Sequence, residues 1–281
     1  MNKEIFINKL KELNDIASKN NIEDCRCAYG DFLTICRYKR LPKEVLSHLE
    51  ELVNSLKTGV VEYIKTSPSN DPYLSDVLTF FITNYKDEDE CNSLLPYLKE
   101  IMYEAIPTFD LLVNIILIYQ SSRYPWRARK YVLELEKLEQ KSVIKYETLA
   151  RFYQNVHDFV KAYYAYIDLF ALTGSNSYLS KAMNLRDNMP EEYKPEIDLG
   201  LIDESKPRVA NALYLKVDPI EYSPKFLSVF DEVMEEVEAE IDKEGDLHIP
   251  QQRWGIMYTK FLEKGINWKD PTMMNPGTMF D

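Results

Sequence analysis

The chain has 281 residues, of which 45% are hydrophobic, and a formal net charge of −12. Its longest apolar run, 111–118, is far shorter than the roughly twenty residues of a membrane span, and residues 1–10 do not resemble a signal peptide. Four cysteines predict no disulfide framework in a chain of this length, so a cytoplasmic protein is expected.

The pattern of apolar residues predicts an all-α fold. Glycines number only eight, and strictly alternating β-branched runs are almost absent. Short connections between the expected helices predict antiparallel neighbours throughout. Helical spacing of apolar residues is found over 2–19, 28–40, 42–66, 72–85, 91–105, 108–121, 125–141, 143–155, 158–173, 176–188, 224–243 and 249–264.

Five sets of residues recur at a spacing of 34. A period of this length, with an aromatic residue late in one helix and a small residue nine positions later, is typical of stacked helical hairpins. Each hairpin buries its apolar face only against its neighbours. The five sets are Tyr85, Tyr119 and Tyr153; Phe81, Ile115 and Leu149; Leu94, Ala128 and Ala162; Leu98, Val132 and Tyr166; and Ile101, Leu135 and Leu169.

The clearest unit runs from Leu149-Ala150-Arg151-Phe152-Tyr153 through His157-Asp158-Phe159 to Ala162, Tyr166 and Leu169. It resembles the tetratricopeptide repeat, with His157 in place of the turn glycine. The resemblance covers roughly residues 76–176 and implies a solenoid with a partner-binding groove. Tyr119, Arg123 and Trp126 are the residues expected to face a partner in that groove.

Three parts are expected along the chain: N-terminal helices (1–70), helical repeats (71–188) and an acidic C-terminal helical region with a packed, non-helical tail (189–281). Four prolines at positions 190, 195, 207 and 219 prevent one continuous helix in the joining region. There, a short helix over 205–215 is favoured over a strand at 213–217. The apolar tail, with Trp268, is expected to cap the fold; the alternative is that it lies in the groove and touches the ligand.

Negative charge is concentrated near the end of the sequence. Residues 190–246 hold seventeen acidic residues against six basic ones. Much of this excess lies on the predicted helix 224–243, whose apolar stripe faces a core. One interpretation is a solvated outer helix. The other is a docking surface for a basic partner, formed by Glu232, Glu235, Glu236 and Glu240, because an acidic patch accelerates association with such a partner.

No metal or nucleic-acid site is predicted. Cys25, Cys27, Cys36 and His48 could supply zinc ligands, but a single residue separates Cys25 from Cys27, whereas zinc pairs are usually two to four residues apart. The basic clusters 37–40 and 123–130 contain aromatic residues that could stack on bases. In so acidic a chain they are interpreted as helix-end charges instead.

The sequence contains no phosphate-binding loop, no dinucleotide fingerprint and no His-Glu-x-x-His motif, and its three histidines (His48, His157 and His248) are interpreted as surface or capping residues. The prediction is therefore a non-enzymatic protein-binding module without a cofactor, most concretely a bacterial immunity protein that binds a basic toxin. A peptide-responsive regulator stays open, although residues 1–66 lack a clear DNA-recognition helix. An enzyme with a helical-bundle pocket is the remote alternative.

Overall fold

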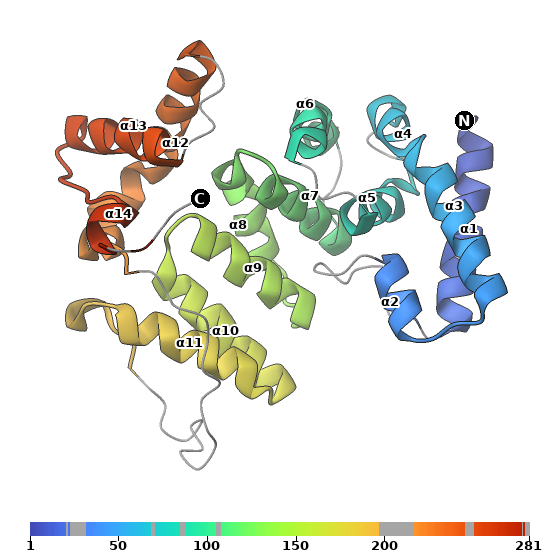
Figure 1. Cartoon of the computed structure of the whole chain (residues 1–281), viewed down its shortest axis with the longest axis horizontal. Coiled ribbons are helices and arrows are strands. Elements are labelled where there is room, and N and C mark those ends of the chain that lie inside the picture. The colour runs from blue at the N-terminus through green and yellow to red at the C-terminus, as the bar shows by residue number, and fades with distance from the viewer. Residues whose placement is uncertain are drawn as a thin grey trace. The chain divides into compact units, whose positions relative to one another are not determined.

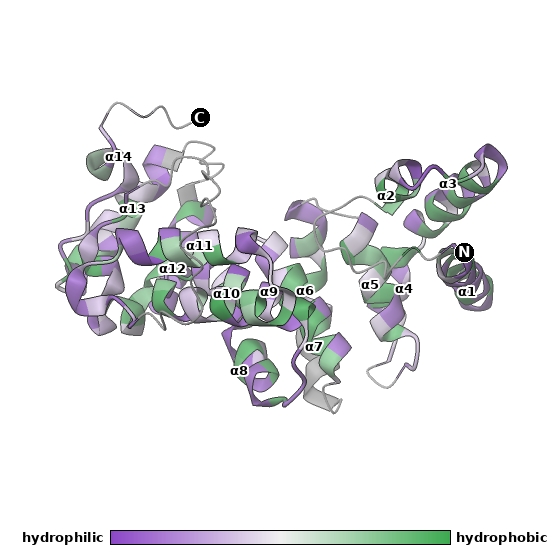
Figure 2. Ribbon diagram, turned by 90° about the horizontal axis from the view of Figure 1, so that it is seen from below, coloured by the Kyte–Doolittle hydropathy of each residue, from purple (hydrophilic) through white to green (hydrophobic). Residues whose placement is uncertain are grey.

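The computed structural model describes residues 1–20, 22, 32–68, 71–84, 88–104, 108–196, 216–244, 250–276 and 278 (Figure 1). Every regular element within these ranges is helical, which confirms the predicted all-α class. Most helices carry both polar and apolar residues, as amphipathic packing requires (Figure 2). No helix in the described part of the chain is both long and apolar enough to cross a bilayer.

The chain divides into two compact units, 1–139 and 140–281. The three-part organisation expected from the sequence stays a prediction. In unit 1, α5 and α6 each pack against α7, and α7 packs against η1 and α8. The elements of unit 1 are α1 (Lys3–Lys19), α2 (Phe32–Tyr38), α3 (Lys43–Lys57), α4 (Val60–Thr66), α5 (Leu74–Asn84), α6 (Glu88–Glu104), α7 (Phe109–Ser121), the short 3₁₀ helix η1 (Pro125–Ala128) and α8 (Arg129–Lys137).

Unit 2 contains three consecutive antiparallel helices followed by a second helical pair. In the first group α10 packs against both α9 and α11, and in the second α12 packs against α13 (Figure 1). The elements of unit 2 are α9 (Val143–Asn155), α10 (Phe159–Thr173), α11 (Asn176–Asn188), η2 (Glu191–Tyr193), η4 (Pro219–Tyr222), α12 (Pro224–Glu244), α13 (Pro250–Glu263) and α14 (Pro271–Met274).

The 34-residue period is visible in the helix positions. α7 and α9 begin at residues 109 and 143, and η1 and α10 begin at residues 125 and 159. Within the described part of the chain, the members of the five sets are buried, including Leu94, Ala128 and Ala162. Tyr85 and the side chain of Ile101 lie outside the described residues. The shared spacing therefore corresponds to equivalent core positions of successive helix pairs.

Local signals set several helix ends. Ser142 and Asp158 accept hydrogen bonds from backbone N–H groups of the first turns of α9 and α10. α10 ends at Gly174, whose φ of 65° lies in the left-handed region. Ser223 accepts a hydrogen bond from the Phe226 N–H at 3.2 Å and so caps the start of α12. Gly265, with φ of 70°, follows the end of α13.

Two helix predictions need correction. The expected continuous helix 42–66 is broken between α3 and α4, where Gly59 caps the start of α4. A Cβ atom at Gly59 would lie 3.1 Å from Met1 Cε and 3.3 Å from Phe6 Cδ2, so close packing against α1 favours glycine at the break. The expected non-helical tail contains α14, because Asp270 caps its first turn and Pro271 fits the first helical position. The helix expected at 205–215 falls outside the described residues.

Buried Asp71 connects α1 with the turn between α4 and α5 through hydrogen bonds. Its carboxylate accepts hydrogen bonds from Lys3 Nζ at 2.6 Å, Tyr63 Oη at 3.0 Å and the Tyr73 N–H at 2.9 Å. Burial by itself favours the neutral acid, but these three donors outweigh it and lower the pKa of Asp71. The same burial, together with the neighbouring Asp71, raises the pKa of Tyr63.

Ala162 offers a direct test of the repeat register. Its side chain is fully buried on α10, between helices α9 and α11. Replacing Ala162 with Phe should reduce the free energy of unfolding by about 1–3 kcal/mol, because the added ring has no space between packed helices. Ala171 is exposed on the same helix, and Ala171→Phe is the matched control, expected to change stability by less than about 0.5 kcal/mol. Equal urea midpoints for both variants would contradict the register.

Candidate functional site

The predicted acidic docking residues lie on α12, where they meet cations of α13 and the residue after it. Glu232 and Glu236 both pair with Lys264, at 2.7 and 2.9 Å, and Glu240 pairs with Lys260 at 2.9 Å. Glu235 is half-buried on the same helix. Glu232, Glu236 and Glu240 therefore have intramolecular counterions, which the sequence analysis did not anticipate.

The ion pairs change the pKa values of the two lysines. Hydrogen bonds to the carboxylates of Glu232 and Glu236 raise the pKa of Lys264, and the hydrogen bond to Glu240 raises the pKa of Lys260. A signal for the pairing was present in the sequence. Glu232, Glu236 and Glu240 follow a spacing of four, while positions 253, 260 and 264 are spaced by seven and four, so each set occupies one face of its helix.

A buried ion pair lies beside these exposed ones. Glu238 points into the interface between α12 and α13, with its side chain 2% exposed, and pairs with Arg253 Nη2 at 2.5 Å. The interpretation of this helix as a solvated outer helix does not describe Glu238. In the structure it belongs to the interior, next to the apolar stripe that includes Val237 and Ile241.

The predicted groove residues lie in unit 1 and contribute mainly to its core. Tyr119 and Trp126 are buried, and the Tyr119 ring lies 5.6 Å from that of Tyr131. Burial raises the pKa of Tyr119. Half-buried Arg123 donates its backbone N–H to the side-chain oxygen of Asn92 at 3.0 Å. Two of the three side chains are thus buried within unit 1, and the partner-binding role of the three residues stays a prediction.

An aromatic and cationic cluster lies within the turn between α7 and α8. The guanidinium of exposed Arg127 lies 4.0 Å from the centre of the Tyr124 ring, which is close enough for a cation–π contact. Trp126 meets Tyr124 edge to face at 5.8 Å. The basic residues of 123–130 are thus partly engaged with aromatic rings of the same segment.

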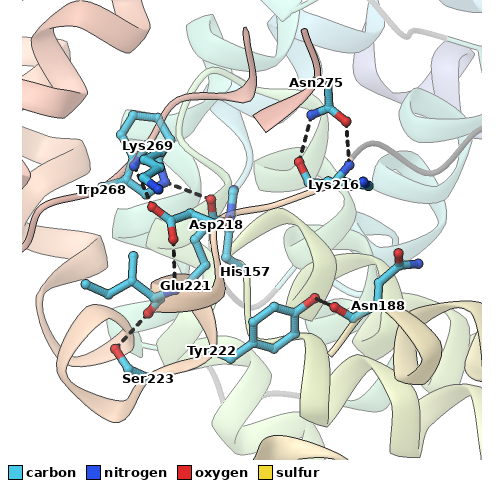
Figure 3. A network of polar contacts seen from close by, with 11 residues as sticks. His157, Asn188, Lys216, Asp218, Glu221, Tyr222, Ser223, Trp268, Lys269 and Asn275 are labelled. Carbon is cyan, nitrogen blue, oxygen red and sulfur yellow. Dashed lines mark hydrogen bonds and ion pairs between the residues drawn. The ribbon is translucent and has the colours of Figure 1, made fainter. Parts of the chain in front are cut away.

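A network of polar contacts in unit 2 surrounds Glu221 in η4 (Figure 3). This carboxylate is 3% exposed, and its Oε1 accepts the indole N–H of buried Trp268 at 2.7 Å. Its Oε2 contacts Nδ1 of His157, which lies in the turn between α9 and α10. His157 has a φ of 60°, a left-handed conformation that glycine adopts most readily.

Two further contacts hold residues 266–275 against residues 216–223. Asp218 accepts the Lys269 N–H at 2.6 Å, and the Asn275 side chain forms a pair of hydrogen bonds with the Lys216 backbone, at 2.7 and 2.8 Å (Figure 3). Ile266 and Trp268 are fully buried. The apolar tail therefore packs, as predicted, but no sequence signal singled out Glu221 as its acceptor.

The other residues considered as zinc ligands or capping residues are His48, His248 and the cysteines. His48 pairs with Glu12 at 2.7 Å on the surface of unit 1. Cys36 is buried on α2, whereas Cys25, Cys27 and His248 lie outside the described residues. Among the described residues, no group of three or more His, Cys, Asp or Glu side chains is arranged to hold a metal ion.

The chain was compared with protein families, curated proteins and solved structures. No family model matches the chain, and neither a curated protein nor a solved structure gives a significant match. Two features of unit 2 stand out: the acidic face of α12 with its cations, and the buried network around Glu221. The predicted groove residues belong to unit 1, so the two sets of predicted binding residues lie in different units.

Proposed function

We propose that this chain is a non-enzymatic helical module that binds a basic protein, as an immunity-type inhibitor holds a toxin. The observation that carries the proposal is the charge of α12 and α13. With Lys264 included, the two helices hold nine acidic residues against five basic ones, a net charge of −4. An acidic surface of this kind attracts a basic partner and accelerates its association.

The intramolecular pairs do not prevent this role. The Glu232 side chain is 62% exposed and that of Glu240 is 40% exposed, so both carboxylates are accessible to a partner. Exposed ion pairs contribute only about 0–1 kcal/mol, and lysine or arginine side chains of a partner can therefore replace the cations of α13 at small cost. Lys260 and Lys264 reduce the local charge without blocking the carboxylates.

The helix pairs of both units also support a binding role. Equivalent positions of the 34-residue period are buried in α7 and α8 of unit 1 and in α9 and α10 of unit 2. Repeated amphipathic pairs of the tetratricopeptide type use their buried faces for stacking and leave extended outer faces for partners. The proposal includes a cytoplasmic location, a basic protein as the partner and a tetratricopeptide-like repeat.

The test uses substitutions that are expected to change the association rate constant in opposite directions. The partner is first captured from native lysate at low salt, released at high salt, and then purified for kinetic measurements with the full chain. Glu232→Gln together with Glu236→Gln should lower the association rate constant about threefold at low salt, because the attracting charge falls. Lys264→Gln should raise it, because the same carboxylates lose their counterion. Both effects should fade at high salt.

The matched control removes the same number of negative charges from a different helix, α3 of unit 1. Glu44 and Glu51 are exposed on α3 of unit 1, so Glu44→Gln with Glu51→Gln should alter the association rate constant much less. If the two glutamine pairs gave the same rate constants, overall charge and not α12 would set the rate. If Lys264→Gln and the α12 pair both left it unchanged, the acidic docking role would be wrong. Circular dichroism verifies that each variant keeps its helical content.

A further inference from the structure

A turn rich in positive charge joins α2 to α3 in unit 1 (Figure 1). Residues 37–43 form this basic turn, and none of the seven is acidic. Its four cations are Arg37, Lys39, Arg40 and Lys43, all of them exposed. Arg37 pairs with Glu50 at 2.8 Å, and Glu44 follows in the first turn of α3, where the helix dipole favours a carboxylate. The basic turn therefore presents a surplus of positive charge on an acidic chain.

An exposed tyrosine lies between these cations. Tyr38 is the last residue of α2, and it is 88% exposed. The side chains of Tyr38, Arg40 and Lys43 form no hydrogen bond, ion pair or ring contact with the described part of the chain. Tyrosine and arginine are the residue types enriched at the centres of protein interfaces. This combination favours a protein with an acidic surface as the partner of the basic turn.

The backbone of Arg40 supports a role outside the fold of unit 1. Its φ is 55°, and its N–H donates to the Arg37 carbonyl at 3.0 Å as α2 ends. Glycine usually occupies such a position, because a side chain in the left-handed region costs stability. Arg40 accepts this cost although its side chain has no partner within the described residues. Unfavourable backbone conformations of this kind concentrate at functional sites.

A surface of opposite charge is present on the chain itself. Glu232, Glu236 and Glu240 form the acidic face of α12, with the Glu232 side chain 62% exposed and that of Glu240 40% exposed. Eight residues of α-helix place Glu232 and Glu240 about 12 Å apart. Arg40 and Lys43 are separated by at most about 10 Å of chain. Because arginine and lysine side chains are long, a single basic turn can contact both carboxylates.

We propose that the basic turn of one copy of this chain binds the acidic face of α12 in a second copy. The inference rests on the acidic face of the proposed function, because a surface that attracts a basic protein also attracts a basic turn. Each copy carries a net charge of −12, which opposes association. At physiological salt this repulsion is screened beyond about 8 Å, whereas charges buried in a contact are screened much less. The contact joins two different patches, and it competes with the basic partner for the acidic face.

Sedimentation velocity of the purified full chain tests this contact without the basic partner. At about 0.15 M salt, the weight-average sedimentation coefficient should increase as the chain concentration rises from about 5 to about 200 μM. Raising the salt to about 0.5 M should weaken the association about tenfold, because charges form the contact. A chain that stays monomeric at the highest concentration would overturn the proposal.

Exchanging the charges of the two patches identifies the contact. One variant combines Arg40→Glu with Lys43→Glu, and the other combines Glu232→Lys with Glu236→Lys. Each variant by itself should be monomeric, because its turn and its α12 face then carry charge of the same sign. An equimolar mixture should associate again, because each turn meets a face of opposite charge on the other variant. A mixture that stays monomeric would overturn the pairing of turn with face.

The control makes the same change of net charge at another surface. Lys137 and Lys141 are exposed, so Lys137→Glu with Lys141→Glu should leave self-association unchanged. If this control dissociated the copies as fully as Arg40→Glu with Lys43→Glu, net charge would set the association, and the basic turn would have no specific role. Circular dichroism verifies that each variant keeps its helical content.

Self-association and partner binding fail separately. A monomeric chain that still binds its basic partner through α12 would overturn self-association alone. Self-association combined with partner kinetics that ignore the charge of α12 would overturn the docking role alone. A chain that stays monomeric but binds a fluorescein-labelled oligothymidylate, and loses this binding with Arg40→Glu and Lys43→Glu, would assign the basic turn to single-stranded nucleic acid instead.

Discussion

Trp268→Ala should reduce the free energy of unfolding of unit 2 by about 3–5 kcal/mol. The Trp268 side chain is 1% exposed, and its ring lies 5.5 Å from Phe261, so truncation leaves a cavity in the core beside α13. It also removes the donor 2.7 Å from Glu221 Oε1, which leaves a buried carboxylate oxygen without its indole partner. Hydrogen exchange followed by mass spectrometry resolves the loss, with peptides of unit 1 as the internal reference.

Two further substitutions separate packing from hydrogen bonding. Trp268→Phe keeps most of the ring but removes the indole N–H, and its cost should be about 1–3 kcal/mol. Trp254 lies half-buried on α13, so Trp254→Ala should cost clearly less than Trp268→Ala. If the two alanine variants lost similar amounts of unfolding free energy, the contact with Glu221 and the burial of Trp268 would contribute little to the stability of unit 2.

Arg253→Met should destabilise unit 2 by about 3 kcal/mol, because it leaves the buried Glu238 carboxylate without its ion-pair partner. Methionine replaces the length of the arginine stem but not its charge. Combining it with Glu238→Gln should restore part of the stability, since the charge is then removed from the interior. A double-mutant cycle on urea unfolding measures this coupling between the two residues.

The exposed pair on the same helices provides the control. Lys264→Met removes the cation shared by Glu232 and Glu236, whose side chains are 62% and 35% exposed. Its cost should be no more than about 1 kcal/mol, because water solvates the remaining carboxylates. An equal cost for Arg253→Met and Lys264→Met would mean that burial of Glu238 does not distinguish the two ion pairs.

The pairing of α12 with α13 changes the interpretation of the acidic helix. From the sequence, this helix was interpreted either as a solvated outer helix or as a docking surface for a basic partner. In the structure, Lys260 and Lys264 pair with its glutamates and offset part of the repulsion between like charges. The remaining net charge still supports the proposed docking surface, now with lysines whose removal should strengthen attraction.

The repeat spacing illustrates what a periodic pattern can predict. The period identified positions such as Ala162 and Leu169, which are fully buried in α10. Tyr119 and Trp126, which were expected to face a partner in the groove, are also buried. A period identifies equivalent positions along the chain, but it does not tell which equivalent face is covered by a neighbouring helix.

The sequence by itself determined the all-α class and several helix ends, because these depend on residues within one or two turns of each other. Ser223, Gly174 and Gly265 act through neighbouring backbone groups, and apolar spacing follows helix geometry. Only the tertiary structure decided the partners of Glu221, which lie 64 and 47 residues away in sequence. Such partners are selected by the packing of whole helices, and nothing in the local spacing of the chain records which distant side chain will face a buried carboxylate.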